Sequence, residues 1–276
     1  MHPLLELAKN LHRSEEGIWL AGASVPSAFG ERGHDGLLEI EAGSFWFRHR
    51  NRCVTEVVRA HPPAGAILDV GAGNGYVTLA LREAGFDALA VEPGIGGARN
   101  AQKRGLDPVI CATIEGAGFP EGSLPAVGLF DVVEHICDDA GFLRTIRRLL
   151  RPDGMLYVSV PAYQWLWSIE DVLAGHYRRY TLRGIAALLE RSGYSTVFAS
   201  YFFTVLPLPI FLLRSVPSRV GLRKAPSLEL ATAEHRPREG AAGRLMERVL
   251  DWEVRRIRRG RRIAAGGSCL VAARTA

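Results

Sequence analysis

Residues 66–75 of this chain read Ala66-Ile67-Leu68-Asp69-Val70-Gly71-Ala72-Gly73-Asn74-Gly75. A short apolar run passes into glycines and then into apolar residues at helical spacing, which predicts a buried strand, a tight turn and a helix. Glycine removes the side chain where a ligand would lie against the backbone, and the amides at the start of the helix attract negative charge. The segment therefore predicts a nucleotide-like ligand at the end of a strand.

The spacing of the glycines distinguishes between nucleotide-binding motifs. A G-x-G-x-x-G fingerprint that starts at Gly71 needs a small residue at position 76, but that residue is Tyr76 and the third glycine comes one position early. The chain contains no G-x-x-x-x-G-K-S/T sequence, which disfavours a P-loop. Residues 68–75 instead resemble motif I of the class I S-adenosylmethionine-dependent methyltransferases. This resemblance implies S-adenosylmethionine as the cofactor.

The length and composition are typical of a globular protein. The 276 residues are 47% apolar, enough for a large core in one domain with an embellishment. The four cysteines form no C-x-x-C pair, which favours a reducing compartment and gives no indication of a metal site. The N-terminus has no signal pattern, and the longest apolar stretch, residues 201–213, contains two prolines. We therefore expect a cytoplasmic protein that is neither secreted nor membrane-spanning.

The positive charge is concentrated in one segment. The chain has a net charge of +5, and residues 244–262 hold eight arginines against three acidic residues. Apolar residues recur at helical spacing in the same segment, so we expect an Arg-rich amphipathic helix. Basic side chains beside an apolar stretch indicate contact with an anionic membrane surface. The alternative is that the apolar stripe packs on the sheet or on a second subunit, as in a homodimer.

Strands and helices are expected to alternate between residues 66 and 204, which predicts a doubly wound, Rossmann-like α/β sheet. Glycines stop the expected helices at Gly85, Gly105 and Gly193, and Asp138 and Thr181 are expected to cap helix starts. The expected strands lie near 66–70, 87–91, 107–111, 126–131, 155–160 and 195–203, and the expected helices near 74–84, 96–104, 139–150 and 181–192.

The rest of the chain is expected to surround this core. Residues 1–60 are expected to form a helical cap, residues 61–204 together with 267–276 the cofactor-binding core, and residues 205–266 an insertion. The strand-like run 268–273 resembles the antiparallel last strand of class I methyltransferases. The resemblance therefore implies a seven-stranded sheet with a helical N-terminal extension and a long insertion before the last strand.

Two features stand out in the expected cap. Apolar residues between Leu4 and Leu11 follow helical spacing, and residues 17–43 are glycine-rich and are expected to form loops or turns. Residues 44–52 resemble an aromatic–arginine stretch that covers the cofactor in some methyltransferases. The alternative for this stretch is an amphipathic helix with its arginines in solvent.

Ligands of an open α/β sheet bind beyond the carboxyl ends of its strands. At the end of the first core strand, the resemblance implies that the backbone of Gly71, Ala72 and Gly73 meets the methionine moiety of the cofactor. Asp69 is expected to order this turn, and Asn74 belongs to the same cofactor-binding motif.

The next strand ends supply the remaining cofactor contacts that the resemblance implies. Glu92, followed by Pro93, would accept two hydrogen bonds from the ribose hydroxyls. The backbone of Thr113 and Ile114 would face the adenine, and Asp131 would point toward the site from the end of the fourth core strand.

Three residues are candidates for catalysis. His135 ends a stretch that resembles the family segment finishing in Glu-His, and it is either a base or a helix-start histidine. His176 and Tyr163 follow the fifth core strand, where they would position or deprotonate the acceptor. The alternative is aromatic packing with solvated arginines. Methyl transfer needs mainly enclosure and alignment, with a base only for acceptors such as a hydroxyl.

The sequence thus predicts an S-adenosylmethionine-dependent methyltransferase that acts on a small-molecule or lipid-linked acceptor. A nucleotide-dependent oxidoreductase is disfavoured by Tyr76. The Arg-rich segment leaves a nucleic-acid-modifying enzyme open, but no Asn/Asp-Pro-Pro-Tyr motif is present, which disfavours nucleic acid as the partner. A non-catalytic methyltransferase-like protein also stays open, because Ala112 and Pro125 depart from the family pattern.

Overall fold

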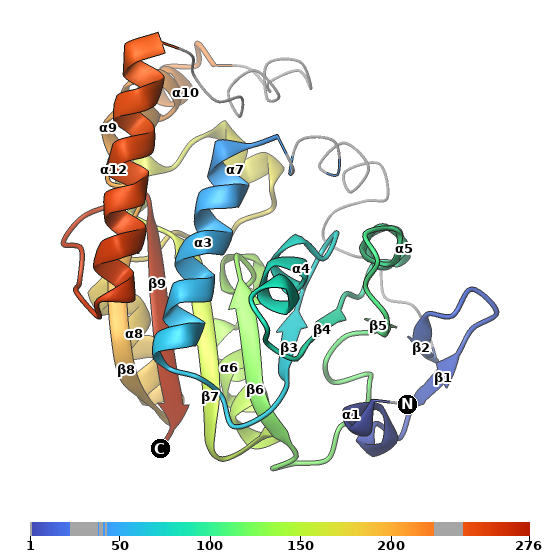
Figure 1. Cartoon of the computed structure of the whole chain (residues 1–276). Helices are drawn as coiled ribbons and strands as arrows, with labels where there is room; N and C mark the ends of the chain where they lie inside the picture. The colour runs from blue at the N-terminus through green and yellow to red at the C-terminus, as the bar shows by residue number, and fades with distance from the viewer. Residues whose placement is uncertain (1, 23–37, 39–40, 42, 224–239) are drawn as a thin grey trace.

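The structure is a computed structural model that describes residues 2–22, 38, 41, 43–223 and 240–276. Its centre is a mixed sheet with the strand order β1-β2-β5-β4-β3-β6-β7-β9-β8 (Figure 1). The strands are β1 (Leu11–Arg13), β2 (Trp19–Ala21), β3 (Ile67–Val70), β4 (Ala88–Val91), β5 (Val109–Cys111), β6 (Leu124–Phe130), β7 (Leu150–Pro161), β8 (Tyr194–Phe202) and β9 (Ser268–Thr275).

Helices cover both faces of this sheet, with α3 and α4 on one face and α6 and α8 on the other (Figure 1). The longer helices are α3 (Phe45–Ala60), α4 (Tyr76–Glu83), α5 (Ile95–Lys103), α6 (Asp139–Leu149), α8 (Leu182–Arg191) and α12 (Gly240–Arg258). The shorter ones are α1 (Pro3–Leu7), η1 (Val133–His135), η2 (Gln164–Leu166), α7 (Ile169–Leu173), α9 (Pro207–Ile210), the π-helical η3 (Phe211–Ser215) and α10 (Val216–Arg219).

The doubly wound fold is confirmed. Strands β3 to β7 run parallel, and every residue of β3, β4 and β6 is buried, as expected for strands covered on both faces. The chain winds from β3 outward to β4 and β5 and then returns to β6 on the other side of β3. This reversal makes the carboxyl ends of β3 and β6 the topological switch point of the sheet, which is where ligands of such sheets bind.

The local signals for helix ends are also confirmed. The side chain of Asp138 accepts a hydrogen bond from the Gly141 amide at 2.9 Å, and Thr181 caps α8 in the same way. Gly85 and Gly193 have φ of +89° and +88°, a conformation that glycine adopts without strain. The predicted helix and strand positions therefore match the structure within a few residues. The largest difference is β7, which begins at Leu150 because that residue already pairs with Leu124.

The sheet has two strands more than the seven expected, and both come from the N-terminal segment. The helical spacing between Leu4 and Leu11 corresponds to α1 alone, because Leu11 already begins β1, which forms an antiparallel hairpin with β2 in which Leu11 pairs with Ala21. Strand β2 then pairs in parallel with β5. Pairing satisfies the backbone groups that β5 would otherwise expose at the sheet edge. Most of the glycine-rich range 17–43 lies outside the described residues.

The last strand lies where the resemblance implies. Strand β9 inserts between β7 and β8 and runs antiparallel to both. Residues 203–267 connect β8 to β9, and the part of this connection at 224–239 lies outside the described residues. The predicted Arg-rich helix is α12. Its apolar stripe packs against α3 through Leu250, Val254 and Ile257, which are all buried, so this part of the stripe is not free to meet a membrane.

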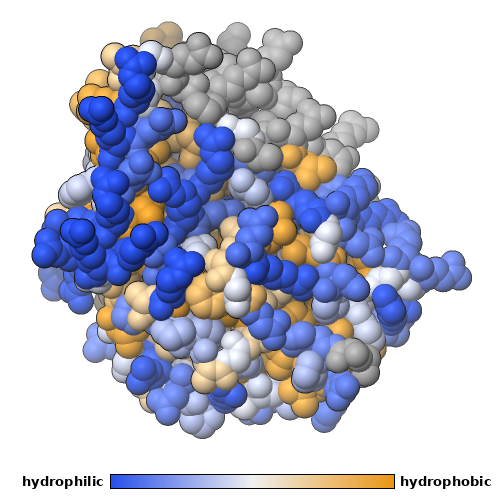
Figure 2. Space-filling view, viewed as in Figure 1, coloured by the Kyte–Doolittle hydropathy of each residue, from blue (hydrophilic) through white to orange (hydrophobic). Residues whose placement is uncertain are grey.

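The first part of the insertion leaves apolar side chains exposed. They lie on and just after the short helices α9, η3 and α10, and apolar atoms show in that region, in the upper left of Figure 2. In the described part of the chain, no helix combines the length and the apolar character that crossing a bilayer requires.

A buried carboxylate joins α12 to the cap helix α3 and to the end of β8. Glu253 accepts hydrogen bonds from the amides of Phe203 and Thr204, each at 2.7 Å, and from the Thr204 hydroxyl at 2.6 Å. His49 of α3 lies 2.8 Å from the same carboxylate. Burial favours a higher pKa for Glu253, but the contacts with His49 and Thr204 outweigh it and hold the pKa below its usual value.

Candidate active site

The three glycines of the turn after β3 have different roles. All have positive φ, with values of +72° for Gly71, +55° for Gly73 and +74° for Gly75. A Cβ atom on Gly71 would lie 2.8 Å from Val132, and one on Gly75 would overlap Leu106. A Cβ atom on Gly73 would have no atom within 4 Å. Close packing therefore explains why residues 71 and 75 are glycines. The backbone of Gly73, in contrast, borders open space.

Glu92 lies at the end of β4 and holds this turn in place. Its Oε2 accepts a hydrogen bond from the Gly73 amide at 2.8 Å, and its Oε1 accepts one from the Gly94 amide at 2.8 Å. The side chain is buried. Glu92 therefore joins the glycine turn after β3 to the residues that follow β4.

Asp69 and Asn74 contact protein groups beneath the turn. The Thr78 hydroxyl donates to Asp69 at 2.6 Å, and burial raises the pKa of Asp69 to about 6. Asn100 donates to the side-chain oxygen of Asn74 at 3.2 Å, and Asn74 in turn donates to Glu41. These contacts link β3, α4 and α5, so both side chains are suited to ordering the turn.

Asp131 brings the cap helix α3 onto the end of β6. Arg50 donates to Asp131 Oδ2 at 2.7 Å, and the Ser159 hydroxyl donates to Oδ1 at 3.0 Å. The guanidinium carbon of Arg50 lies 5.1 Å from the ring centroid of Trp46 and 5.1 Å from that of Phe47. Arg50 is buried, so the alternative of an arginine in solvent does not apply to it.

The residues expected around the adenine of the cofactor would contact it mainly through their backbone groups. Ile114 is buried in the main core, and the hydroxyl of Thr113 accepts a hydrogen bond from the Gly116 amide at 3.0 Å. The Pro93 carbonyl lies 3.7 Å from the sulfur of Cys111. Only backbone groups of Thr113 and Ile114 are therefore suited to face a base.

Two of the three catalytic candidates lie together. The rings of His135 and His176 meet edge to face, with centroids 4.7 Å apart. Burial, aided by His176, lowers the pKa of His135 to about 4, so this imidazole is neutral at pH 7. His135 is the member of the pair that lies near the glycine turn. It belongs to η1, and Val132, the residue just before η1, packs on Gly71.

A buried carboxylate holds His176. Asp171 Oδ1 lies 2.8 Å from His176 Nδ1, and Arg179 donates to both oxygens of Asp171 at 2.7 and 3.0 Å. Burial alone would raise the pKa of Asp171, but the hydrogen bonds from His176 and Arg179 outweigh it and lower the pKa. The charged carboxylate fixes the orientation of the His176 ring.

Glu134 completes the cluster, and sequence reasoning named it only as part of the Glu-His stretch. It is 1% exposed, and its Oε2 has no hydrogen-bond partner in the part of the chain that the structure describes. Burial and the nearby Asp131 raise its pKa well above the usual value. Sequence reasoning also missed Asp171 and Arg179, although an acidic residue five positions before a candidate histidine was a usable signal.

Tyr163 belongs to a separate aromatic group. Its ring stacks between those of Trp165 and Tyr201, at centroid distances of 5.5 and 5.1 Å. Burial, together with Tyr201, raises the pKa of Tyr163 above its usual value. Its hydroxyl therefore stays protonated at neutral pH, which suits positioning better than deprotonation.

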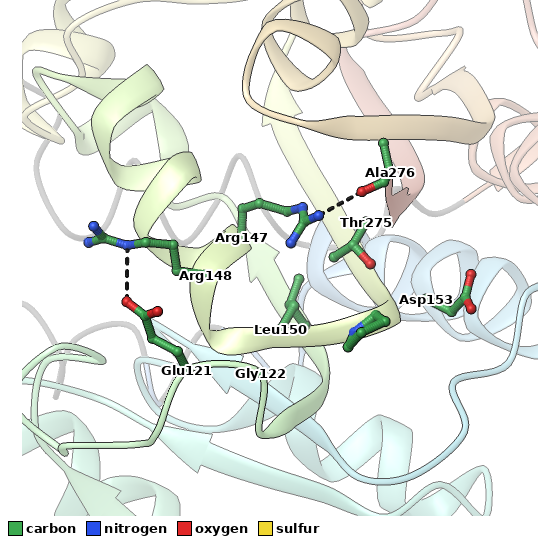
Figure 3. A pocket seen from close by; sticks show the side chains of 9 residues that line it. Glu121, Gly122, Arg147, Arg148, Leu150, Asp153, Thr275 and Ala276 are labelled. Atoms are coloured by element: carbon green, nitrogen blue, oxygen red, sulfur yellow. Dashed lines mark hydrogen bonds and ion pairs between the residues drawn. The ribbon is translucent and has the colours of Figure 1, made fainter.

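A surface hollow at the opposite end of the sheet is not part of this site. Figure 3 shows it between the starts of β6 and β7, where Arg147 donates to the Ala276 carbonyl at 2.6 Å and Arg148 faces Glu121 at 3.7 Å. Ligands of such sheets bind at the carboxyl ends of the strands, so this hollow has no expected role with the cofactor.

Comparison with known proteins decides the family. The profile of the family described as "Methyltransferase domain" matches residues 41–198, more than half of the chain. The chain belongs to the methyltransferase-domain family. The match spans the glycine turn, Glu92 and the histidine pair, so S-adenosylmethionine is the cofactor of this class I methyltransferase domain.

Named relatives agree with this assignment. A probable S-adenosylmethionine-dependent methyltransferase of Mycobacterium tuberculosis is 28% identical over 144 residues, which cover 51% of this chain and 52% of that protein. A ubiquinone biosynthesis O-methyltransferase of Methylocella silvestris is 33% identical over 98 residues, covering 34% of this chain and 38% of its own. The methyltransferase chain thus spans about half the length of the first of these curated relatives.

Solved structures share the fold. A putative methyltransferase from Haloferax volcanii, crystallised with a methyltransferase activator, is 15% identical with a TM-score of 0.55, covering 89% of this chain and 96% of its own. A methyltransferase from Thermotoga maritima is 18% identical with a TM-score of 0.52 and the same coverage. At these identities the similarity shows the fold alone.

The residues of the turn fit the cofactor. The open space beside Gly73 would accommodate a group that lies against the backbone, and Glu92 accepts a hydrogen bond from the Gly73 amide there. A buried carboxylate, which accepts hydrogen bonds, suits the ribose hydroxyls of S-adenosylmethionine.

Proposed function

We propose that this methyltransferase transfers the methyl group of S-adenosylmethionine to a hydroxyl group of a small-molecule or lipid-linked acceptor. The observation that carries the proposal is the histidine pair beside the open turn: Val132 packs on Gly71, and His135 and His176 follow at the same edge of the sheet. A hydroxyl acceptor needs a base, and this pair supplies imidazole nitrogens there.

The cofactor would be held by the residues around the turn. The backbone of Gly71, Ala72 and Gly73 would hold the methionine moiety, and Glu92 would accept from the ribose hydroxyls. Pro93 and the backbone of Thr113 and Ile114 would border the adenine, while Asp69, Asn74 and Asp131 keep the surrounding elements in place through the contacts described above. When bound, the sulfonium supplies an electrophilic methyl group.

The proton of the acceptor hydroxyl would pass to His176. With its Nδ1 side held by Asp171, the ring presents Nε2 as the proton acceptor, and the negative carboxylate stabilises the imidazolium that forms. The deprotonated acceptor oxygen would then be the nucleophile toward the methyl group that the cofactor supplies. His135 stays neutral and does not add a second positive charge to the pair.

The names of several relatives support a lipid-like acceptor. They include ubiquinone biosynthesis O-methyltransferases and, at 26% identity over 128 residues, a demethylmenaquinone methyltransferase of Corynebacterium urealyticum. An aromatic wall also suits such an acceptor, because Trp165 stacks on Tyr163 and packs edge to face on Phe211. Nucleic acid is disfavoured, since Arg258 and Arg52 are already paired with Glu56 and Asp251.

Methyl transfer should depend on the open space at Gly73. The purified chain, given radiolabelled S-adenosylmethionine and a bacterial lipid extract, is expected to label an organic-soluble product, and Gly73→Arg is expected to abolish both labelling and cofactor binding by calorimetry. Gly85→Arg is the matched control, because Gly85 also has positive φ and open space but ends α4 at the surface. Labelling that survives in Gly73→Arg, or no heat from the unchanged chain, would contradict the proposal.

We further propose the division into a cap at 1–60, a core at 61–204 with 267–276, and an insertion at 205–266, with the insertion touching an anionic membrane. The insertion carries exposed apolar side chains and also exposed arginines on α12, including Arg248 and Arg255. The apolar side chains are, with their exposed fractions, Leu208 (65%), Leu212 (54%), Leu213 (59%), Val220 (61%) and Leu222 (79%). Apolar insertion and basic attraction together hold peripheral proteins at such surfaces.

The chain is therefore expected to sediment with anionic vesicles at low salt and to be released by salt. Replacing Leu208, Leu212 and Leu213 by Ser should reduce sedimentation at least tenfold, as should Gln at Arg248 and Arg255. Leu7→Ser is the control, since Leu7 is an exposed leucine of α1 at the other end of the molecule (Figure 1). A chain that stays in the supernatant contradicts membrane contact and would make this surface a homodimer interface or a lid.

A further inference from the structure

The geometry points to a metal site: we propose that Glu134, His135 and His176 together bind one divalent transition-metal ion of the Zn²⁺ type. Each residue offers one ligand atom, and the three atoms lie within 4.8 Å of one another. Two imidazoles and one carboxylate are a donor set that binds Zn²⁺ and similar ions, and three protein ligands leave coordination positions open.

The first independent observation is that the carboxylate of Glu134 is buried and incompletely hydrogen-bonded. Glu134 is 1% exposed, and its Oε2 has no hydrogen-bond partner among the described residues. An unsatisfied buried carboxylate oxygen is costly, because it has lost its hydration without gaining a donor. A cation between this oxygen and the two imidazoles would satisfy it.

The setting of His176 is the second observation. Its Nδ1 faces Asp171 at 2.8 Å, which leaves Nε2 as the nitrogen that can bind an ion. Metal-binding histidines usually donate their other ring N–H to a carboxylate, which fixes the tautomer and orients the ring. Arg179 holds both oxygens of Asp171, so the outer carboxylate is itself fixed.

The structure contains a second group of potential metal ligands, which is better explained by a role in stability. Its members are His49, Cys53 and Glu253. The oxygens of Glu253 already accept from Phe203, Thr204 and His49. Burial raises the pKa of the Cys53 thiol well above its usual value, so it does not supply a thiolate. Of these two groups, only the Glu134 group has a carboxylate oxygen without a hydrogen-bond partner among the described residues.

The role of the ion rests on the proposed function, although its binding does not. An oxygen of the acceptor hydroxyl would occupy an open coordination position, where the ion lowers the pKa of that hydroxyl. With the ion bound, Nε2 of His176 would be a ligand, so the hydroxyl proton would leave to water. His176 would act as the base of the proposed function only in the chain without the ion. The site would therefore select acceptors that can place a hydroxyl group at the open coordination position of the ion.

The test is metal binding by the full chain after treatment with a chelator and dialysis, without cofactor. Titration with Co²⁺, followed by visible absorption, and with Zn²⁺, followed by calorimetry, is expected to show one ion per chain. Glu134→Gln and His176→Gln should each weaken binding at least 100-fold, and Asp171→Asn about 10- to 100-fold. His12→Gln, at an exposed histidine of β1, should leave binding unchanged.

Three results would overturn the metal site: no binding of either ion, equal binding by the Glu134 and His176 variants, or a thiolate-to-cobalt band that places the ion at a cysteine. Circular dichroism of each variant checks that it folds. Cofactor calorimetry on the same preparation separates the two proposals, because metal binding without cofactor binding refutes the proposed function alone. Cofactor binding without metal binding refutes only the metal site.

Discussion

Glu92→Ala is expected to weaken S-adenosylmethionine binding about 100-fold or more. Charge-assisted hydrogen bonds contribute about 1.5–3 kcal/mol each, and Glu92 would make two to the ribose. The substitution also frees the amides of Gly73 and Gly94, which Glu92 now holds at 2.8 Å, so the turn loses its fixed shape as well. Calorimetry with S-adenosylmethionine and S-adenosylhomocysteine measures the change.

The control is Glu115→Ala, since Glu115 is an exposed acidic residue that follows β5 near the same edge of the sheet. Its affinity should match that of the unchanged chain. A 2′-deoxy analogue of the cofactor tests the contact directly, because the unchanged chain should bind it more weakly while Glu92→Ala should not distinguish the two. Equal affinity of the unchanged chain for both compounds would place the ribose contact elsewhere.

The largest effect on stability is expected for Glu253→Ala. The substitution leaves the amides of Phe203 and Thr204 without their acceptor and removes the partner of His49, all in a fully buried position. Each buried donor left without its acceptor typically costs about 1–3 kcal/mol, so the loss of several such hydrogen bonds together is expected to destabilise by about 3–5 kcal/mol. Urea unfolding, followed by circular dichroism, is expected to show a loss of this size in the free energy of unfolding.

The matched control is Asp251→Ala in the same helix. Asp251 pairs with Arg52 of the same neighbouring helix α3, but both side chains are about half exposed, at 45% and 51%. Exposed pairs contribute about 0–1 kcal/mol, because water and salt screen them. Equal losses for the two variants would show that the Glu253 contacts do not anchor α12 to α3 and β8.

The sequence could predict those parts of the fold that are encoded within a few neighbouring residues. The buried run of β3, the glycine turn after it, the glycines that end α4 and α8, and the caps Asp138 and Thr181 all depend on local backbone preference. The order of these elements then restricts the sheet to a doubly wound arrangement. The N-terminal hairpin was missed because β1 and β2 have three residues each, too few for a clear period.

The residues of the candidate site likewise fall into those that the sequence predicted and those that only the structure brought together. The sequence by itself determined the glycine turn, the acid after β4 and the Glu-His stretch, because each is a short motif with fixed spacing. Only the tertiary structure decided that Arg50 pairs with Asp131, 81 positions away, and that Glu253 holds the end of β8, 49 positions away. It also decided that His176 joins His135 and Glu134 in one cluster. These contacts depend on how the helices pack on the sheet, and no local preference of the chain encodes which distant side chains that packing brings together.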